Sequence, residues 1–116
     1  MNTSSITYDA LSPLNYTVYE DGTVPAAEAP DTYLTYFIVF EQPEGAANNR
    51  DRTLNSRVQV SMWSKDPALT QNALTTITAA MKAAGFLFIN AGPQRFNAEI
   101  QRYGWRGDYR LYKGME

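Results

Sequence analysis

Few side chains in this sequence could carry out catalysis. Glu41 and Glu44 lie three residues apart, and two neighbouring carboxyl groups can serve as the acid and the base of a hydrolase. Nothing beside them in the sequence would make one an acid and the other a base, so we interpret both as solvated groups. The chain contains no histidine and no cysteine, which removes the commonest general base, the commonest metal ligand and the thiol nucleophile. We therefore expect no enzymatic activity, no cofactor and no metal site.

A second pattern suggests nucleic-acid chemistry. Residues 102–113 alternate aromatic and basic side chains, namely Tyr103, Trp105, Tyr109 and Tyr112 among Arg102, Arg106 and Arg110. Stacking surfaces beside cations are typical of proteins that bind single-stranded nucleic acid. The simpler interpretation is a strand with one buried face and basic side chains at its rim. An isoelectric point of about 5.1 disfavours the nucleic-acid function, which we keep as an alternative.

The charges are unevenly distributed along the chain. Residues 1–49 contain seven acidic side chains and no basic one, whereas residues 50–116 contain all ten basic side chains and five acidic ones. The two parts therefore carry formal charges of −7 and +5, although the whole chain carries only −2. Such a chain can attract a second copy of itself if the fold keeps its two parts separate on the surface. If the two parts interleave in one sheet, the effect cancels.

The length and composition predict one domain. A chain of 116 residues with 44% apolar residues is enough for a single core spanning residues 1–116 and too short for two ordinary domains. The longest apolar runs, at residues 36–40 and 86–89, fall far short of the roughly 20 residues of a membrane helix. The first six residues lack the features of a signal peptide. We expect a protein made in the cytoplasm, without a membrane partner.

The first part of the chain predicts one short helix and two strands. Ser4 or Ser5 is a natural cap for a helix that ends before Pro13, and residues 16–19 read as a short strand. Residues 23–31 contain two prolines and suggest an extended linker. Residues 33–40 are β-branched and aromatic on both alternating faces, which predicts a central strand covered on both sides.

The second part predicts further strands around a longer helix. Residues 57–63 alternate, with Val58, Val60 and Met62 pointing inward. The polar residues 42–56 predict a loop too long for a tight turn, and loops of that length are usually functional or disordered. Asp66, Pro67 and Gly85 bound the predicted helix, whose apolar stripe is Leu74, Ile77, Met81 and Ala84.

The last part of the chain predicts two short strands. We expect a strand at residues 86–89, a turn at 90–94, an ordinary turn at Arg106-Gly107-Asp108 rather than a cell-adhesion motif, and a last strand at 108–113. The fold class is therefore α+β, a mainly antiparallel sheet with one long and one short helix packed on it.

Several segments, taken in order, resemble a known family. They are Tyr16–Tyr19 followed by Val24-Pro25, Ala29-Pro30 before Tyr33–Tyr36, Val58 to Pro67, and Met81 to Phe86. Over about residues 8–90 this order is similar to the small tail terminator or tail-completion proteins of long-tailed bacteriophages and related prophages. The shared features are structural and not catalytic. Residues 96–105 depart from the family pattern.

The resemblance implies a structural virion protein that is assembled in the host cytoplasm. Such proteins form a ring, commonly of six subunits, on the head-proximal end of the tail tube. There the ring stops tube polymerisation and joins the tail to the head. The implied partners are further copies of the chain, the tail tube protein and the head–tail connector proteins, with DNA only passing through the lumen. A head-completion or neck connector protein of similar fold is the nearest alternative, because it also needs a ring and leaves no chemical signature.

A ring also suggests which residues meet between subunits. Each subunit of a ring uses two different faces, so complementary charges are expected across the contact. The hypothesis is that Glu41 and Glu44 meet Arg50, Arg52 or Arg57 of a neighbouring subunit. Reversing Arg50 and Arg52 to glutamate should then leave a folded monomer that fails to cap tail tubes.

Overall fold

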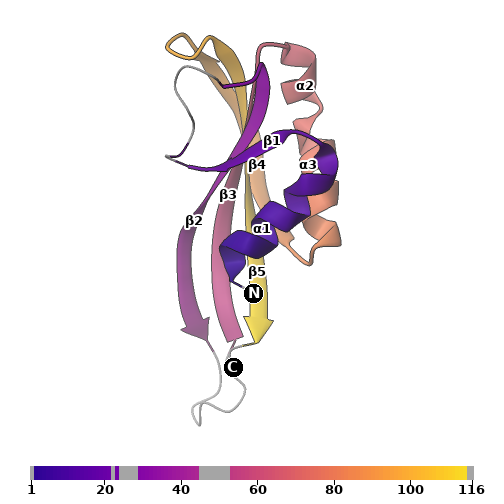
Figure 1. The fold of residues 1–116 in the computed structure, drawn as a ribbon. Helices are drawn as coiled ribbons and strands as arrows, with labels where there is room; N and C mark the ends of the chain where they lie inside the picture. The colour runs from indigo at the N-terminus through magenta and orange to yellow at the C-terminus, as the bar shows by residue number, and fades with distance from the viewer. Residues whose placement is uncertain (1, 22, 24–28, 45–52, 115–116) are drawn as a thin grey trace.

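Five strands form one sheet in the order β1-β2-β3-β5-β4 (Figure 1). In this computed structural model, which describes residues 2–21, 23, 29–44 and 53–114, β1 and β2 are parallel and the other neighbouring strands are antiparallel. The strands are β1 (Thr17–Glu20), β2 (Thr32–Glu44), β3 (Thr53–Ser64), β4 (Leu87–Asn97) and β5 (Arg102–Gly114). The helices are α1 (Thr3–Leu11), a 3-10 turn η1 (Ser12–Leu14), α2 (Pro67–Gln71) and α3 (Ala73–Ala83).

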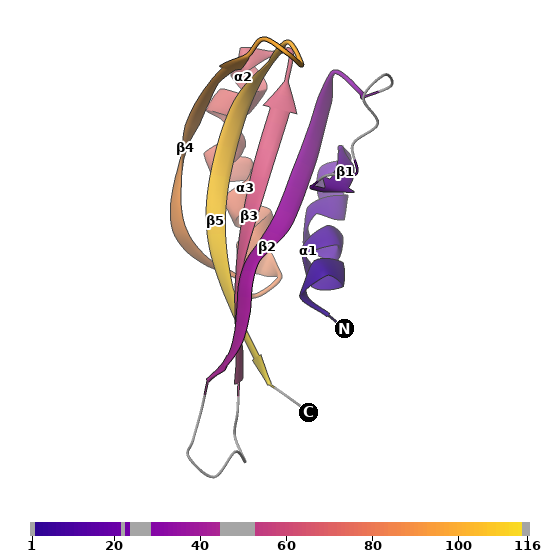
Figure 2. The same ribbon diagram turned by 90° about the vertical axis from the view of Figure 1, so that its left-hand side faces the viewer.

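The helices lie together on one face of the sheet. Figure 1 shows α1, α2 and α3 on one side, and Figure 2 is turned so that the opposite face is toward the viewer. This arrangement confirms the predicted α+β class with a mainly antiparallel sheet and helices on one face. We refer to the face opposite the helices as the open face.

The core lies between the helices and the sheet. Val58, Val60 and Met62 of β3 point into it, as the alternation predicted, because successive strand residues face opposite sides. The helices contribute mainly Leu11, Ile77 and Met81. The remaining core residues are Ala10, Leu34, Tyr36, Ala73, Phe86, Trp105, Tyr109 and Leu111. Every described element except β1, η1, α2 and β4 supplies a fully buried apolar side chain to this core.

The N-cap of helix α1 lies two or three residues before the predicted caps. The Asn2 side chain accepts a hydrogen bond from the backbone N–H of Ser5 at 2.8 Å, so Asn2 is the N-cap and the prediction of Ser4 or Ser5 is wrong. The Ser4 hydroxyl instead contacts the Tyr36 hydroxyl at 2.9 Å and links α1 to β2. The helix ends before Pro13, as predicted.

The predicted long helix between Asp66 and Gly85 is broken. Its start is confirmed, because Asp66 accepts a hydrogen bond from the backbone N–H of Ala68 at 2.9 Å. At Asn72 the side-chain amide bonds back to the Ala68 carbonyl at 3.1 Å, and the chain divides into α2 and α3. The long helix is therefore two helices, of 5 and 11 residues.

The break also changes which residues of the helical segment are buried. In α3 the buried residues are Ala73, Ile77 and Met81, spaced four apart. Leu74 is 47% exposed and does not belong to the buried stripe. Gly85 has a φ of +97° and follows the helix end, which confirms its predicted role there.

Strands β2 and β3 form a longer hairpin than predicted. Their pairing continues from Thr32–Ser64 to Glu44–Thr53, so the predicted loop at residues 42–56 is wrong at both ends. Residues 45–52 lie outside the described residues, and so does most of the linker that was predicted at residues 23–31. The strand predicted at 33–40 is confirmed as part of β2, and its residues 33–36 are all buried, but β3 and not β2 occupies the middle of the sheet.

Strands β4 and β5 are also longer than predicted. The predicted turn at residues 90–94 lies within β4, and Arg106-Gly107-Asp108 lies within β5. Gly104 allows a close approach in this region, because a Cβ atom there would stand 2.6 Å from the Trp63 ring. Glycine marks a place where an aromatic ring covers the backbone, and it does not end the strand.

Three strands continue beyond the rest of the sheet. β1 pairs with β2 only as far as Tyr36, and β4 pairs with β5 only as far as Arg110. Residues 41–44, 53–56 and 111–114 therefore form a three-stranded extension, which projects past α3 at the lower end of the molecule in Figure 1. We call these residues the extension.

Candidate protein interface

Glu41 and Glu44 lie on β2 in the extension. The Glu41 carboxylate accepts a hydrogen bond from the Ser56 hydroxyl at 2.9 Å, and the Glu44 carboxylate accepts one from the Asn55 amide at 3.0 Å. Both glutamates are exposed, and both contact their own hairpin partner strand. Each carboxylate keeps an oxygen that can accept a further bond from another molecule.

Arg57 lies on the open face and has a partner within the chain. Its guanidinium forms an ion pair with Asp108 of β5 at 2.7 Å, and Asp108 is buried. Among the described residues, Asp108 Oδ1 and the Nε atoms of Arg57 and Arg110 have no hydrogen-bond partner although they are buried. Contact of Arg57 with a neighbouring subunit stays a prediction. Arg50 and Arg52 lie outside the described residues.

The fold keeps the acidic and basic parts of the chain apart. The first part supplies α1, β1 and β2, and the second supplies β3, β5, β4, α2 and α3. Because the strand order is β1-β2-β3-β5-β4, the two parts lie side by side and do not interleave. The acidic residues described on the first side are Asp9, Glu20, Asp21, Asp31, Glu41 and Glu44. One edge of the sheet is therefore acidic, and the opposite part is basic overall.

The two outer edges of the sheet carry exposed apolar side chains. In the part of the chain that the structure describes, no strand pairs with β2 beyond Tyr36 or with the outer side of β4. Phe37 and Val39 are exposed on the first edge, and Leu87 and Phe88 on the second. A strand edge with free N–H and C=O groups can pair with another chain, and apolar side chains beside it favour that contact.

A shallow hollow lies between α1 and α3. Its volume is about 380 Å³, and its apolar lining includes Ile6, Pro13 and the small side chains Ala80 and Ala83. Asp9 is the acidic residue at its rim. The hollow is suited to an apolar side chain of a protein partner, since its lining offers few groups to orient a polar ligand.

The aromatic and basic run at residues 102–113 does not form one stacking surface. Trp105 and Tyr109 are buried in the core, while Tyr103 and Tyr112 are exposed. The Tyr109 hydroxyl contacts that of Thr78 at 2.9 Å, and burial raises the pKa of Tyr109 to about 12. Tyr103, Trp105 and Tyr109 lie at alternate positions of β5 and Tyr112 lies on its other face, so the core takes up two of the four rings. The strand with one buried face is confirmed, although Arg102 is buried and does not lie at the rim.

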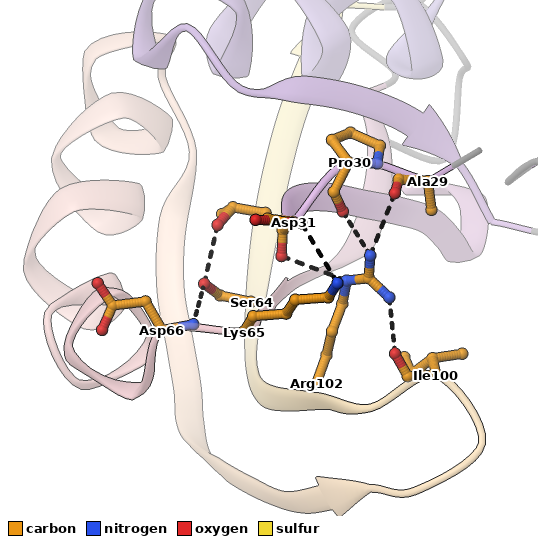
Figure 3. Close-up of polar contacts among 9 residues, drawn as sticks. Ala29, Pro30, Asp31, Ser64, Lys65, Asp66, Ile100 and Arg102 are labelled. Atoms are coloured by element: carbon orange, nitrogen blue, oxygen red, sulfur yellow. Dashed lines mark hydrogen bonds and ion pairs between the residues drawn. The ribbon is translucent and has the colours of Figure 1, made fainter.

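Arg102 is buried, and none of the described carboxylates is its partner. Figure 3 shows its guanidinium donating to the backbone carbonyls of Ala29, Pro30, Asp31 and Ile100, at 3.1, 2.7, 3.2 and 2.6 Å. The same group lies 5.3 Å from the centre of the Tyr33 ring. Arg102 therefore fixes the entry to β2 against the turn between β4 and β5. No sequence motif marks this role, because backbone carbonyls supply its partners.

The described residues offer no metal site and no membrane-spanning helix. Within them, no three acidic side chains gather as metal ligands. None of their helices has the length and apolar character needed to cross a membrane. The arrangement is suited to protein contacts along the sheet edges, the extension and the open face.

The sequence matches no protein-family model and no curated protein. A solved structure does share the fold: a chain of the "Virion of native gene transfer agent (GTA) particle" aligns with a TM-score of 0.57 and 14% identity. The alignment covers 97% of this chain and 95% of that chain. The two chains thus have the same fold over nearly their whole lengths.

Proposed function

We propose that this protein is a structural subunit of a phage-like virion and acts as its tail terminator. In this role a ring of subunits, six as the family resemblance implies, covers the head-proximal end of the tail tube. The ring stops tube growth and presents a surface to the head connector, while DNA passes through its lumen. The protein makes and breaks no covalent bond.

The observation that carries this proposal is the fold shared with a chain of a virion particle over nearly the whole of both chains. The separation of charge supports it. A ring needs two different surfaces on each subunit, and an acidic edge on one side with a basic region on the other meets that need. The extension supplies a further surface, which would reach the tail tube or the head connector.

Removal of the gene tests the proposal. Electron microscopy of particles made without this protein should show overlong tail tubes that are not joined to heads. Supplying the intact chain from a plasmid should restore tails of uniform length. Tails of regular length beside unattached heads would contradict the terminator role and favour a neck connector.

Single-stranded nucleic-acid binding is a weaker alternative, because two of its four predicted aromatic rings are buried. A fluorescence titration with a labelled oligonucleotide separates the two functions. The terminator proposal expects no saturable binding at physiological salt. Tight binding that weakens with salt and depends on Tyr103 would favour the alternative.

A further inference from the structure

The two free edges of the sheet carry their exposed apolar side chains at matching positions. On β2, Phe37 is 37% and Val39 45% exposed. On β4, Leu87 is 56% and Phe88 40% exposed. These residues lie on opposite sides of one subunit, so they cannot contact each other within it.

The pairing register places range 37–40 of β2 and range 87–90 of β4 at the same height along the strand direction. Phe40 of β2 is aligned through Arg57 and Arg110 with Leu87 of β4. In the same way, Phe37 is aligned through Gln59 and Asp108 with Asn90. The ranges 37–40 and 87–90 therefore correspond across the sheet. Each contains an irregularity, at Val39 and at Ile89.

The strand directions permit the two edges to pair. Three antiparallel steps separate β2 from β4, so β4 runs opposite to β2. A second copy in the same orientation would bring its β4 to the free edge of β2 as an antiparallel neighbour. In a ring whose axis follows the strands, rotation moves each copy sideways without shifting it along the strand, so residues at the same level meet.

On the helix side of the sheet, an acidic side chain lies beside the β2 edge and a basic side chain lies beside the β4 edge. Glu41 follows Phe40, and its contact with Ser56 directs it to the face on which Ser56 touches Thr3 of α1. Lys82 is exposed in the last turn of α3, which leads directly into β4. When range 37–40 of one copy lies beside range 87–90 of another, Glu41 and Lys82 come to the same side of the contact.

We propose that residues 37–41 of β2 bind residues 87–90 of β4 from a second copy of this chain, with Glu41 facing Lys82. The partner is another subunit in the same orientation, so the contact is head-to-tail and can close into a ring. This interface rests on the ring assembly of the proposed function and names its contact residues.

Disulfide cross-linking tests the interface directly, because the chain contains no native cysteine. In the double variant Phe40→Cys, Leu87→Cys, the paired Cα atoms of neighbouring strands would lie about 5 Å apart, within disulfide range. Oxidation of the purified protein and of assembled particles should give a ladder of covalent oligomers on a non-reducing gel. Each single variant should give none, and a mixture of the two single variants should give dimers only.

Two outcomes would overturn the interface. Dimers formed by a single variant alone would indicate a two-fold contact through one edge. A double variant that gives no ladder in either sample would show that the two edges do not meet. The control is Tyr8→Cys with Leu87→Cys, because Tyr8 is exposed on helix α1 and belongs to no strand of the sheet. This pair should not cross-link.

A charge exchange tests the predicted ionic contact. Glu41→Lys and Lys82→Glu should each weaken self-association by about fivefold, measured by analytical ultracentrifugation, and the double exchange should restore it. Circular dichroism should show that all three variants are folded. Failure of the double exchange to restore association would contradict the Glu41–Lys82 contact.

The interface and the proposed function can fail separately. A disulfide ladder together with normal tails in the gene deletion would retain the interface and reject the terminator role. Overlong tails without a ladder would retain the terminator role and reject this interface.

Discussion

The helix-covered part of the sheet and the extension are stabilised in different ways. The covered part buries apolar side chains from both of its layers, such as Val60 and Ile77. The extension supplies one buried apolar side chain, Leu111, and its other contacts include the polar pairs Ser56 with Glu41 and Asn55 with Glu44. The comparison shows that the first part has an apolar core of its own, whereas the second is a paired surface that is suited to contact another molecule.

The largest expected effect lies in the covered part. Ile77→Ala removes a fully buried side chain from α3 and should lower the free energy of unfolding by about 2–5 kcal/mol. Urea denaturation measures this change. Leu74→Ala in the same helix is the matched control and should cost less than about 1 kcal/mol, because Leu74 is nearly half exposed. Equal losses would contradict the assignment of the buried stripe.

The next effect concerns Arg102, which joins distant segments of the covered part. Arg102→Ala leaves four backbone carbonyls without their donor and should lower the free energy of unfolding by about 3 kcal/mol. Arg102→Lys should recover only part of this loss, since a lysine cannot donate in a planar fork. Arg106→Ala, on the exposed side of the same strand, is the control and should change little.

The smallest effect is expected in the extension. Ser56→Ala removes the hydrogen bonds to Glu41 and Thr3 and should lower the free energy of unfolding by about 1 kcal/mol. Hydrogen exchange should show faster exchange in the extension than in the core part of β3. A loss as large as that of Ile77→Ala would show that the extension is part of the core, and the contrast between the two regions would not hold.

The sequence predicted best the elements whose apolar residues repeat. The inward face of residues 57–63 and the helix start at Asp66 follow from local pattern and capping chemistry, and both are confirmed. The polar ends of the β2–β3 hairpin were assigned to a loop because they lack apolar alternation. They form strands because they pair with each other, and the sequence does not show this pairing. Gly107, where a side chain would collide with the Trp105 ring, was assigned to a turn for a similar reason.

The candidate interface was predictable only in part. The separation of charge along the chain is visible in the sequence. Whether the acidic and basic parts also lie apart on the surface depends on the strand order, which the sequence does not reveal. Glu41 and Arg57 were chosen by charge alone, whereas the structure gives each a partner within the chain. Phe40 and Leu87 were missed, since their shared level appears only once the register of four strands is known.

β1 covers only the first part of the β2 edge, and this limits where another strand can pair with β2. Its four residues already occupy the positions beside Tyr33 to Tyr36. An incoming strand therefore cannot slide toward the start of β2, and its register is limited to positions after Tyr36. β1 thus restricts pairing at this edge to residues 37–44 of β2.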